Sequence, residues 1–218
     1  MTTWATRLSD IRDELQETTA GFWSDAALLR YGNRAYQRII RRLRVEKTST
    51  LTLVVGTEAY SLPTDFYLAR RVELQTQAGS TTSWQEVRAL SLDHRRPGDP
   101  LQTATLTAIP TDYYIFADQI HFVPQPDQAY SGTLYYYRDA TSLTLTTSPL
   151  VYPKGINTEK FDEVFDWYVC AMALRKRQDP AYTTYLGDYA AGLNDLVADS
   201  EKRGQAKPLI VSDDWESE

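Results

Sequence analysis

The chain has 218 residues, a length that allows one or two globular domains. Hydrophobic residues make up 42% of it, which is too many for a disordered protein. Its net charge of −6 argues against a dedicated nucleic-acid binder, and its single cysteine excludes an internal disulfide framework and a cysteine-based zinc site. No stretch approaches the roughly 18 consecutive apolar residues of a membrane span, and the first residues lack the features of a signal peptide, so we expect a mature start and no membrane contact.

The first 48 residues have the pattern of two helices. Trp4, Leu8, Ile11 and Leu15 recur at helical spacing and predict a first amphipathic helix. Gly21 ends it, and Ser24 is a suitable N-cap for a second helix that runs to about Lys47. The apolar face of the second helix carries Leu28, Tyr31, Ala35, Tyr36, Ile39, Ile40 and Leu43. The opposite face carries Arg30, Arg34, Arg38 and Arg41.

Residues 49–155 have the pattern of a β-rich region. Strands are predicted at 51–55, 71–75, 84–87, 113–116, 120–123 and 132–138. Pro63 ends an extended segment in a turn, and residues 94–100 form a loop because they hold two prolines and a glycine. Strands 113–116 and 120–123 form a hairpin around a turn at residues 117–119. We expect Tyr114, Phe116, Ile120 and Phe122 to share one face of it.

Helices return after Gly155. Phe161, Val164, Phe165, Tyr168, Val169 and Met172 form one helical stripe, and Asp179-Pro180 indicates the start of a further helix. Neither helix pair can hide its apolar stripe alone. The sequence therefore predicts an α+β fold, in which residues 1–48 and 156–203 form a four-helix bundle. Residues 49–155 would form a β-rich, sandwich- or barrel-like insert, and residues 204–218 an acidic C-terminal arm.

Signatures of catalysis are absent from the sequence. It contains no phosphate-binding loop, dinucleotide fingerprint, H-E-x-x-H motif or nucleophile elbow. The histidines, His94 and His121, are far apart in sequence, and Cys170 lies within an apolar helix, which favours a buried, inert thiol. The sequence thus predicts a protein that is not an enzyme and that has no catalytic site, cofactor or metal.

Two charged patterns on the helices are candidate interaction sites. The acidic strip consists of Glu159, Asp162, Glu163 and Asp166 near the start of the third helix. It is open to interpretation as a solvated, dipole-stabilised face, as paired carboxylates or cation ligands, or as an intersubunit contact. The arginine stripe consists of Arg30, Arg34, Arg38, Arg41, Arg42 and Arg44 on the second helix.

The arginine stripe also has three interpretations. It could be a solvated face, an interface with an acidic partner, or a contact with the DNA backbone. The acidic strip is its obvious complement, either within one bundle or between neighbouring subunits. A head-to-tail contact that closes by rotation makes a ring, and it needs two different faces of opposite character.

The acidic tail contains one aromatic residue, Trp215. A single tryptophan in an acidic arm either anchors the arm on a partner or belongs to a disordered tail.

Several segments together carry a resemblance to a known family. They are the helical opening from Trp4 to Leu15, residues 31–36 (Y-G-N-R-A-Y), the turn at residues 55–66, the hairpin from Tyr114 to Pro124, and the Tyr-rich strand 132–137. In these segments the chain resembles the head-to-tail adaptor (connector or neck) proteins of tailed bacteriophages, in plan those of short-tailed phages. The family pattern G-T-x-x-Y-x-L-P-x-D-F matches residues 56–66, whereas the hairpin turn departs from the family in having Ala117-Asp118 instead of glycine.

This resemblance implies a twelve-copy ring in the neck of the virion, between head and tail. The ring would dock on the portal protein, extend the channel for passing DNA without reading its sequence, and receive the next tail (nozzle) protein. Residues 204–218, with Trp215 as anchor, would reach the portal or a neighbouring subunit. The alternative function is a DNA-binding module that uses the arginine stripe.

Overall fold

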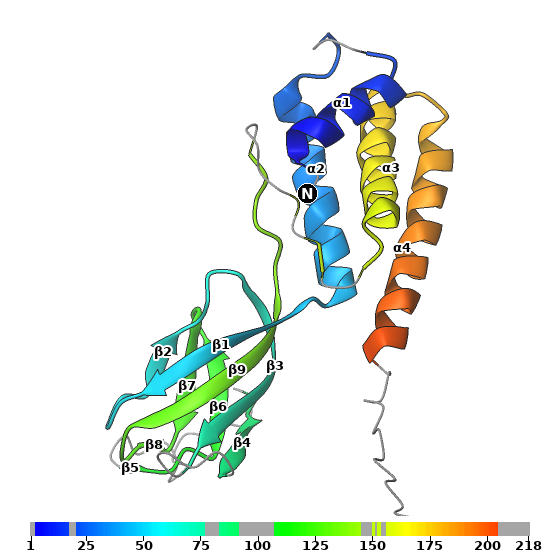
Figure 1. Ribbon diagram of the computed structural model, residues 1–218. Helices are drawn as coiled ribbons and strands as arrows, with labels where there is room; N and C mark the ends of the chain where they lie inside the picture. Colours follow the sequence, from blue (N-terminus) through cyan, green and yellow to red (C-terminus); the bar gives the residue numbers. More distant parts are fainter. Residues whose placement is uncertain are drawn as a thin grey trace, which may run out of the picture. The chain divides into compact units, whose positions relative to one another are not determined.

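A computed structural model describes residues 3–17, 21–76, 83–91, 107–144, 150, 152–153 and 156–204 of the chain (Figure 1). The helices within these residues are α1 (Trp4–Glu14), α2 (Asp25–Leu43), α3 (Thr158–Arg177) and α4 (Tyr182–Gly204). The strands are β1 (Glu46–Leu53), β2 (Ala59–Ser61), β3 (Phe66–Gln75), β4 (Trp84–Ala89), β5 (Thr107–Ala108), β6 (Asp112–Phe116), β7 (Gln119–Val123), β8 (Gln125–Pro126) and β9 (Tyr130–Arg138). This order confirms the predicted α+β fold, with a central β-rich insert between N- and C-terminal helices.

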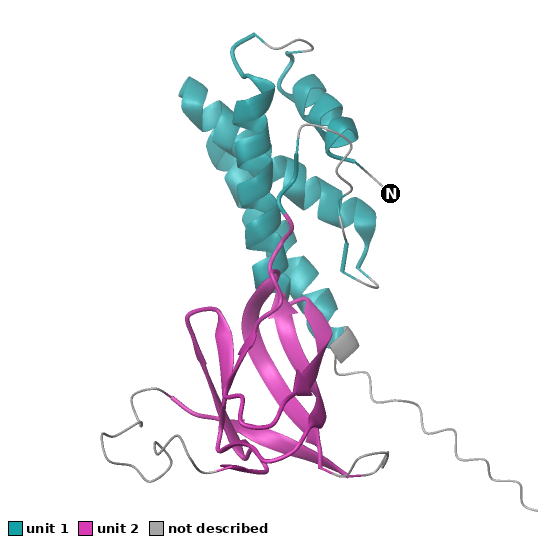
Figure 2. Ribbon diagram, turned by 90° about the vertical axis from the view of Figure 1, so that its left-hand side faces the viewer, with its two compact units in different colours: residues 1–43, 142–218 teal, residues 44–141 magenta. Residues whose placement is uncertain are grey.

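The chain divides into two compact units (Figure 2). The helical unit contains residues 1–43 and 142–218, and the β unit contains residues 44–141. Leu143 and Leu150 are buried in the helical unit, although the sequence analysis placed these positions in the β insert. Asn33 of α2 explains this for Leu143, since its side-chain amide donates to the Leu143 carbonyl at 3.2 Å and its oxygen accepts from the Leu143 amide at 2.7 Å.

The four helices each begin beside a polar side chain that accepts a backbone N–H. Thr3 accepts from Thr6, and Asn157 accepts from both Glu159 and Lys160. The predicted cap Ser24 is confirmed, because its Oγ accepts from Ala27 at 3.3 Å. Before α4, Asp179 Oδ1 accepts from Ala181 at 3.0 Å, in the turn that leads into the helix. These contacts satisfy donors that the first helical turn otherwise leaves unpaired.

The predicted helical stripes form the core of the helical unit. On α1, Trp4 and Ile11 are buried and Leu8 is half-buried, and Leu15, just after the helix, is buried as well. Helix α3 packs on the three other helices and is buried along much of its length, which includes the predicted residues Phe161, Val164, Phe165, Tyr168 and Val169. Burial of each large apolar side chain contributes about 1.5–3 kcal/mol, so these stripes hold the bundle together.

The β unit is a seven-stranded, nearly closed, barrel-like sheet in the order β1-β9-β3-β4-β6-β7-β2. Its neighbouring strands are antiparallel except for the short β4–β6 pair. Strands β5 and β8 form a separate parallel pair, which the sequence analysis missed because each has only two residues. The core of the unit consists of Leu51, Leu53, Val72, Leu74, Val87, Tyr113, Ile120, Phe122, Tyr130, Leu134 and Tyr136.

Helix α2 ends earlier than predicted, at Leu43 rather than about Lys47. Arg44 has a φ of 49°, in the left-handed region, which stops the helix and turns the chain into β1 at Glu46. The strand thus starts five residues before the predicted Leu51, on a polar segment whose residues 46–50 carry little apolar signal.

The predicted face of the β6–β7 hairpin is also wrong. The turn has two residues, Ala117 and Asp118, so that Phe116 lies opposite Gln119 and Tyr114 opposite His121. Opposed residues share a face, so Ile120 and Phe122 point into the core together with Ile115 and Tyr113, and not with Tyr114 and Phe116. The assumed three-residue turn shifted the register by one, and Phe116 is in fact 58% exposed.

Candidate interaction surfaces

The arginine stripe follows the exposed side of α2 and ends at Arg44, just after the helix, and all six of its residues are exposed. The opposite side of this helix is buried through Leu28, Ala35, Tyr36, Ile39 and Ile40. Arg38 of the stripe lies over the ring of Tyr168 of α3, with 5.1 Å from its guanidinium carbon to the ring centroid. The arginine stripe therefore lies on the protein surface, and Arg38 is its member that contacts α3.

The acidic strip is divided by the structure into two exposed and two inward-facing carboxylates. Glu159 and Glu163 are exposed, whereas Asp162 is buried and Asp166 half-buried. The hydroxyl of Tyr152 donates to Asp162 Oδ1 at 2.6 Å, and Arg7 Nη1 of α1 donates to Asp166 Oδ2 at 2.8 Å. At Asp166 the cationic partner thus comes from α1 rather than from the arginine stripe.

Arg7 was not among the site residues predicted from the sequence. This residue follows the buried Trp4 by three positions, so it lies on the same side of α1 and reaches α3. In a single sequence, an arginine beside an apolar stripe is only a weak indication of an ion pair with another helix. Burial raises the pKa of Asp166 to about 7, even though Arg7 lowers this pKa, and the nearby carboxylates of Asp162 and Asp10 raise it further.

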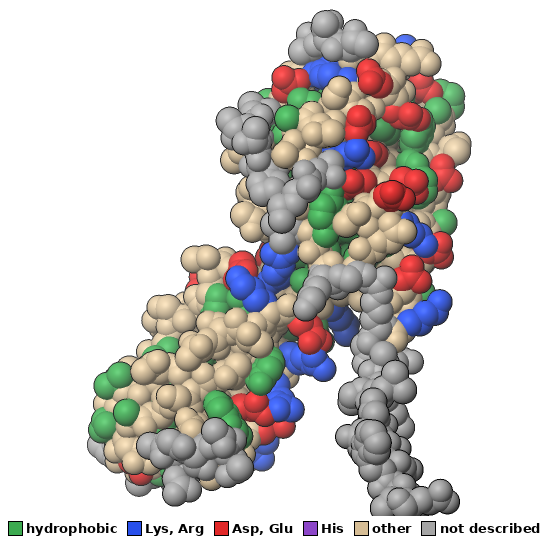
Figure 3. All heavy atoms as spheres, in the orientation of Figure 1, with side chains coloured by type: hydrophobic (Ala, Val, Ile, Leu, Met, Phe, Trp, Pro, Cys, Tyr) green, Lys and Arg blue, Asp and Glu red, His purple; other side chains and the backbone are tan. Residues whose placement is uncertain are grey.

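Acidic side chains gather on one face of the helical unit, over α1, α3 and α4 (Figure 3). The exposed carboxylates of these helices are Asp10, Asp13, Glu14, Glu159, Glu163, Asp188, Asp195 and Glu201. Lys160 of α3 offsets part of this charge, since its Nζ lies 3.2 Å from Asp195 and 3.8 Å from Asp199. The helical unit therefore carries carboxylates on α1, α3 and α4 and a row of exposed arginines on α2.

Cys170 is buried, as predicted for a thiol on an apolar helix. Burial raises its pKa, and the carboxylates of Asp166 and Glu14 raise it further. A thiol in this setting is protonated at neutral pH and is a poor nucleophile.

The motif at residues 31–36 on α2 has structural roles within the helical unit. A Cβ on Gly32 would lie 2.5 Å from the ring of Trp4 and 3.3 Å from the ring of Phe165, so glycine is needed for the contact with α1. Asn33 holds Leu143, and Ala35 and Tyr36 are buried. Only Arg34 of this motif is both charged and exposed.

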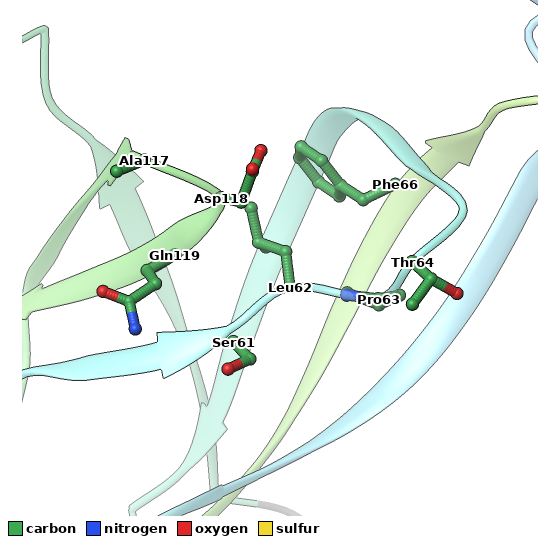
Figure 4. A pocket seen from close by; sticks show the side chains of 8 residues that line it. All are labelled: Ser61, Leu62, Pro63, Thr64, Phe66, Ala117, Asp118 and Gln119. Atoms are coloured by element: carbon green, nitrogen blue, oxygen red, sulfur yellow. The ribbon is translucent and has the colours of Figure 1, made fainter.

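The motif at residues 56–66 contains β2, which pairs with β7, and it packs on the core of the β unit. Leu62 and Phe66 pack against the core, and the Tyr60 hydroxyl donates to the Thr57 carbonyl at 3.0 Å and accepts from the Val54 amide at 2.8 Å. Asp65 accepts from the Tyr136 hydroxyl at 2.8 Å and from Lys47 Nζ at 2.7 Å. The same segment lines a hollow of about 540 Å³ together with the turn residues 117–119 (Figure 4).

The remaining sequence candidates do not come together in a catalytic arrangement. His121 stacks on Tyr114 with 4.6 Å between ring centroids, and its Nδ1 lies 3.5 Å from Glu58 Oε1. In the described ranges, no group of three or more metal-binding side chains converges, and no helix is long and apolar enough to cross a bilayer. His94 and Trp215 lie outside the described residues, as does the arm beyond Gly204.

Comparison with known proteins identifies the family. The family model described as SU10 adaptor protein matches residues 2–211, which is nearly the whole chain. The chain belongs to the SU10 adaptor family. It is therefore a phage adaptor protein, a component of the virion that contacts other head or tail proteins, and its family is structural rather than enzymatic. No curated protein matches the chain.

Proposed function

We propose that this adaptor forms a ring, of twelve copies by its resemblance to neck proteins, that docks on the portal. The ring would extend the channel for DNA and receive the next tail protein. The observation that carries this proposal is the family match over residues 2–211. It is supported by a helical unit whose exposed carboxylates and whose arginine stripe lie on different helices, because head-to-tail rings need two different, complementary faces.

The intersubunit contact in this proposal pairs the arginine stripe of one copy with exposed carboxylates of the next. Glu159 and Glu163 are available for it, whereas Asp166 is engaged by Arg7 within the chain. Guanidinium groups pair with carboxylates in two-pronged hydrogen bonds that fix orientation as well as affinity. The C-terminal arm with Trp215 would add a contact to the portal or to a neighbouring subunit.

The test is direct assembly on the portal. A portal protein from the same phage is mixed with the purified chain, and the product is examined by size-exclusion chromatography and electron microscopy. We expect a ring of adaptor density on one end of the portal. Failure to form a complex over a range of salt and protein concentrations would contradict the proposal.

The arginine stripe also supports a second candidate, which is non-specific contact with DNA phosphates. Affinity from such contacts falls steeply as salt increases, because binding releases condensed counterions. Titration of duplex DNA with the adaptor at low and moderate salt measures this contact. The absence of binding at low salt would exclude it.

A further inference from the structure

Helix α1 packs on the bundle through buried Trp4 near its start and buried Ile11 in its second half. Trp4 is fully buried, fills the space left by Gly32 of α2, and meets Phe165 of α3 edge-on with 6.1 Å between ring centroids. One helical turn later, Arg7 makes the charged contact with α3.

In the charged contact between α1 and α3, a single guanidinium group faces three carboxylates. Arg7 pairs with Asp10 of α1 and Asp166 of α3, and its Nη1 lies 4.0 Å from Asp162. Arg7 Nε and Asp166 Oδ1 are both buried, and neither has a hydrogen-bond partner among the described residues. A buried anionic oxygen that accepts no hydrogen bond is costly, and protonation of Asp166 removes its charge.

The groups around Asp166 come from every helix near it. Helix α1 contributes Arg7, Asp10 and Glu14, and α3 contributes Asp162 and Cys170. Tyr152, which precedes α3, donates to Asp162, and Tyr185 of α4 donates to Glu14. Carboxylates outnumber cations in this cluster, so both the burial and the local charge favour neutral Asp166.

We propose that α1 is a pH-responsive clasp, held on α3 more tightly in mildly acidic than in neutral or alkaline solution, because docking buries Asp166 among carboxylates that Arg7 alone does not neutralise. The device goes beyond ring formation and does not depend on it. Its consequence is a controlled release of Trp4 from its contact with Gly32.

The direction of the pH effect on docking follows from proton uptake by Asp166. In the docked state the pKa of Asp166 is raised to about 7 by burial. When α1 lifts away, water reaches this carboxylate and its pKa returns towards the ordinary 3.8. At a pH between these two pKa values, Asp166 therefore takes up a proton when α1 docks. The docking constant decreases by up to about tenfold per pH unit in this window and is constant above it.

Amide hydrogen exchange of residues 4–14, measured by mass spectrometry on the full chain, tests the proposal. The variant Asp166→Asn mimics the neutral carboxyl and should keep α1 docked at every pH. Comparison of the two proteins at the same pH cancels the chemical pH dependence of exchange. We expect the ratio of wild-type to variant exchange rates to rise at least tenfold between pH 5 and pH 7.5 and then to level off.

Three comparisons make the experiment specific to α1. Asp13→Asn removes an exposed carboxylate of the same helix and should give wild-type rates throughout. Gly32→Ala places a Cβ against Trp4 and should give fast exchange in α1 at every pH. The reactivity of Cys170 towards a disulfide reagent, compared between wild type and Asp166→Asn at each pH, is a second readout of the same opening.

Two results would overturn the clasp. One is a ratio for residues 4–14 that stays constant between pH 5 and pH 7.5. The other is an equal change in residues 168–174 of α3, because that would mean that Asp166 controls the stability of the whole bundle.

Discussion

At the scale of single residues, Asp65 accepts hydrogen bonds from three other residues of the β unit. Its carboxylate accepts hydrogen bonds from Tyr136 and Lys47, and its carbonyl accepts from the amide of Asp139 at 2.7 Å. Burial by itself would raise the pKa of Asp65, but the hydrogen bonds from Lys47 and Tyr136 outweigh it and hold this pKa below its ordinary value. The pattern L-P-x-D-F at residues 62–66 can thus be explained by folding alone, without a binding role.

Asp65→Asn should destabilise the chain at pH 7 by about 1–2 kcal/mol, since it weakens two charge-assisted hydrogen bonds, of which the one to exposed Lys47 is screened by water. The pKa is lowered on folding, so the carboxylate contributes its full stability above the ordinary pKa and loses it as the pH falls further. The difference from wild type should therefore shrink below about pH 4 in urea unfolding.

Tyr136→Phe serves as the matched partner in this measurement. The double variant should lose less stability than the sum of the two single variants, because both remove the same hydrogen bond. An equal loss in Asp65→Asn at pH 3 and pH 7 would contradict the ionic origin of the effect.

At the scale of elements, the β6–β7 hairpin turns on two residues that are not glycine. Ala117 and Asp118 have φ angles of 49° and 60°, and such left-handed values at both loop residues are what a type I′ hairpin turn requires. Asp tolerates this region better than Ala, whose Cβ meets the following carbonyl. The hairpin is held nevertheless, because Ile120 and Phe122 are fully buried in the core.

Ala117→Gly should stabilise the chain by roughly 0.5–1 kcal/mol, since relief of the left-handed strain exceeds the added entropy of the unfolded glycine. Thermal or urea unfolding measures this change. Ala89→Gly, at an exposed position in β4, is the control and should destabilise by a similar amount. Destabilisation by both variants would mean that Ala117 bears no strain.

At the scale of the whole molecule, charge is distributed between helices rather than mixed evenly on each. Most exposed arginines of the helical unit lie on α2, and most of its exposed carboxylates lie on α1, α3 and α4. A single chain gains little from such exposed charges, because water screens them. Their value is greater between chains, where they favour one orientation of approach over others.

Reversal of Arg34 and Arg38 to Glu should weaken assembly on the portal by tenfold or more while leaving a folded monomer. The expected cost to folding is about 0.5–1 kcal/mol, from loss of the contact between Arg38 and Tyr168. Sedimentation velocity reports assembly, and thermal unfolding reports the fold. The Lys variants at both positions keep the charge and should retain most of the assembly.

The outcome distinguishes the roles of the stripe. A collapsed thermal transition in the Glu variant would show that these arginines hold the bundle rather than the ring. Normal assembly together with lost DNA binding would favour the DNA-contact function instead.

The helices were predictable because their signals are local. Periodic stripes such as Trp4, Leu8, Ile11 and Leu15, and caps such as Ser24 and Asp179, lie within a few residues of one another in the chain. The α+β class, the buried Cys170 and the adaptor family followed from such patterns. Strand register was less predictable, since a one-residue change in the hairpin turn moved Tyr114 and Phe116 to the other face.

Composition and periodicity thus determined which segments form helices or strands and which side chains are apolar enough to be buried. Only the tertiary structure decided that Asp166 faces Arg7, that Gly32 receives Trp4, and that Asp65 joins Lys47 to Tyr136. These partners are 159, 28, 18 and 71 positions apart in sequence. The physical reason is that a side chain's charge state and partners depend on what packs around it, which no local pattern of residue types encodes.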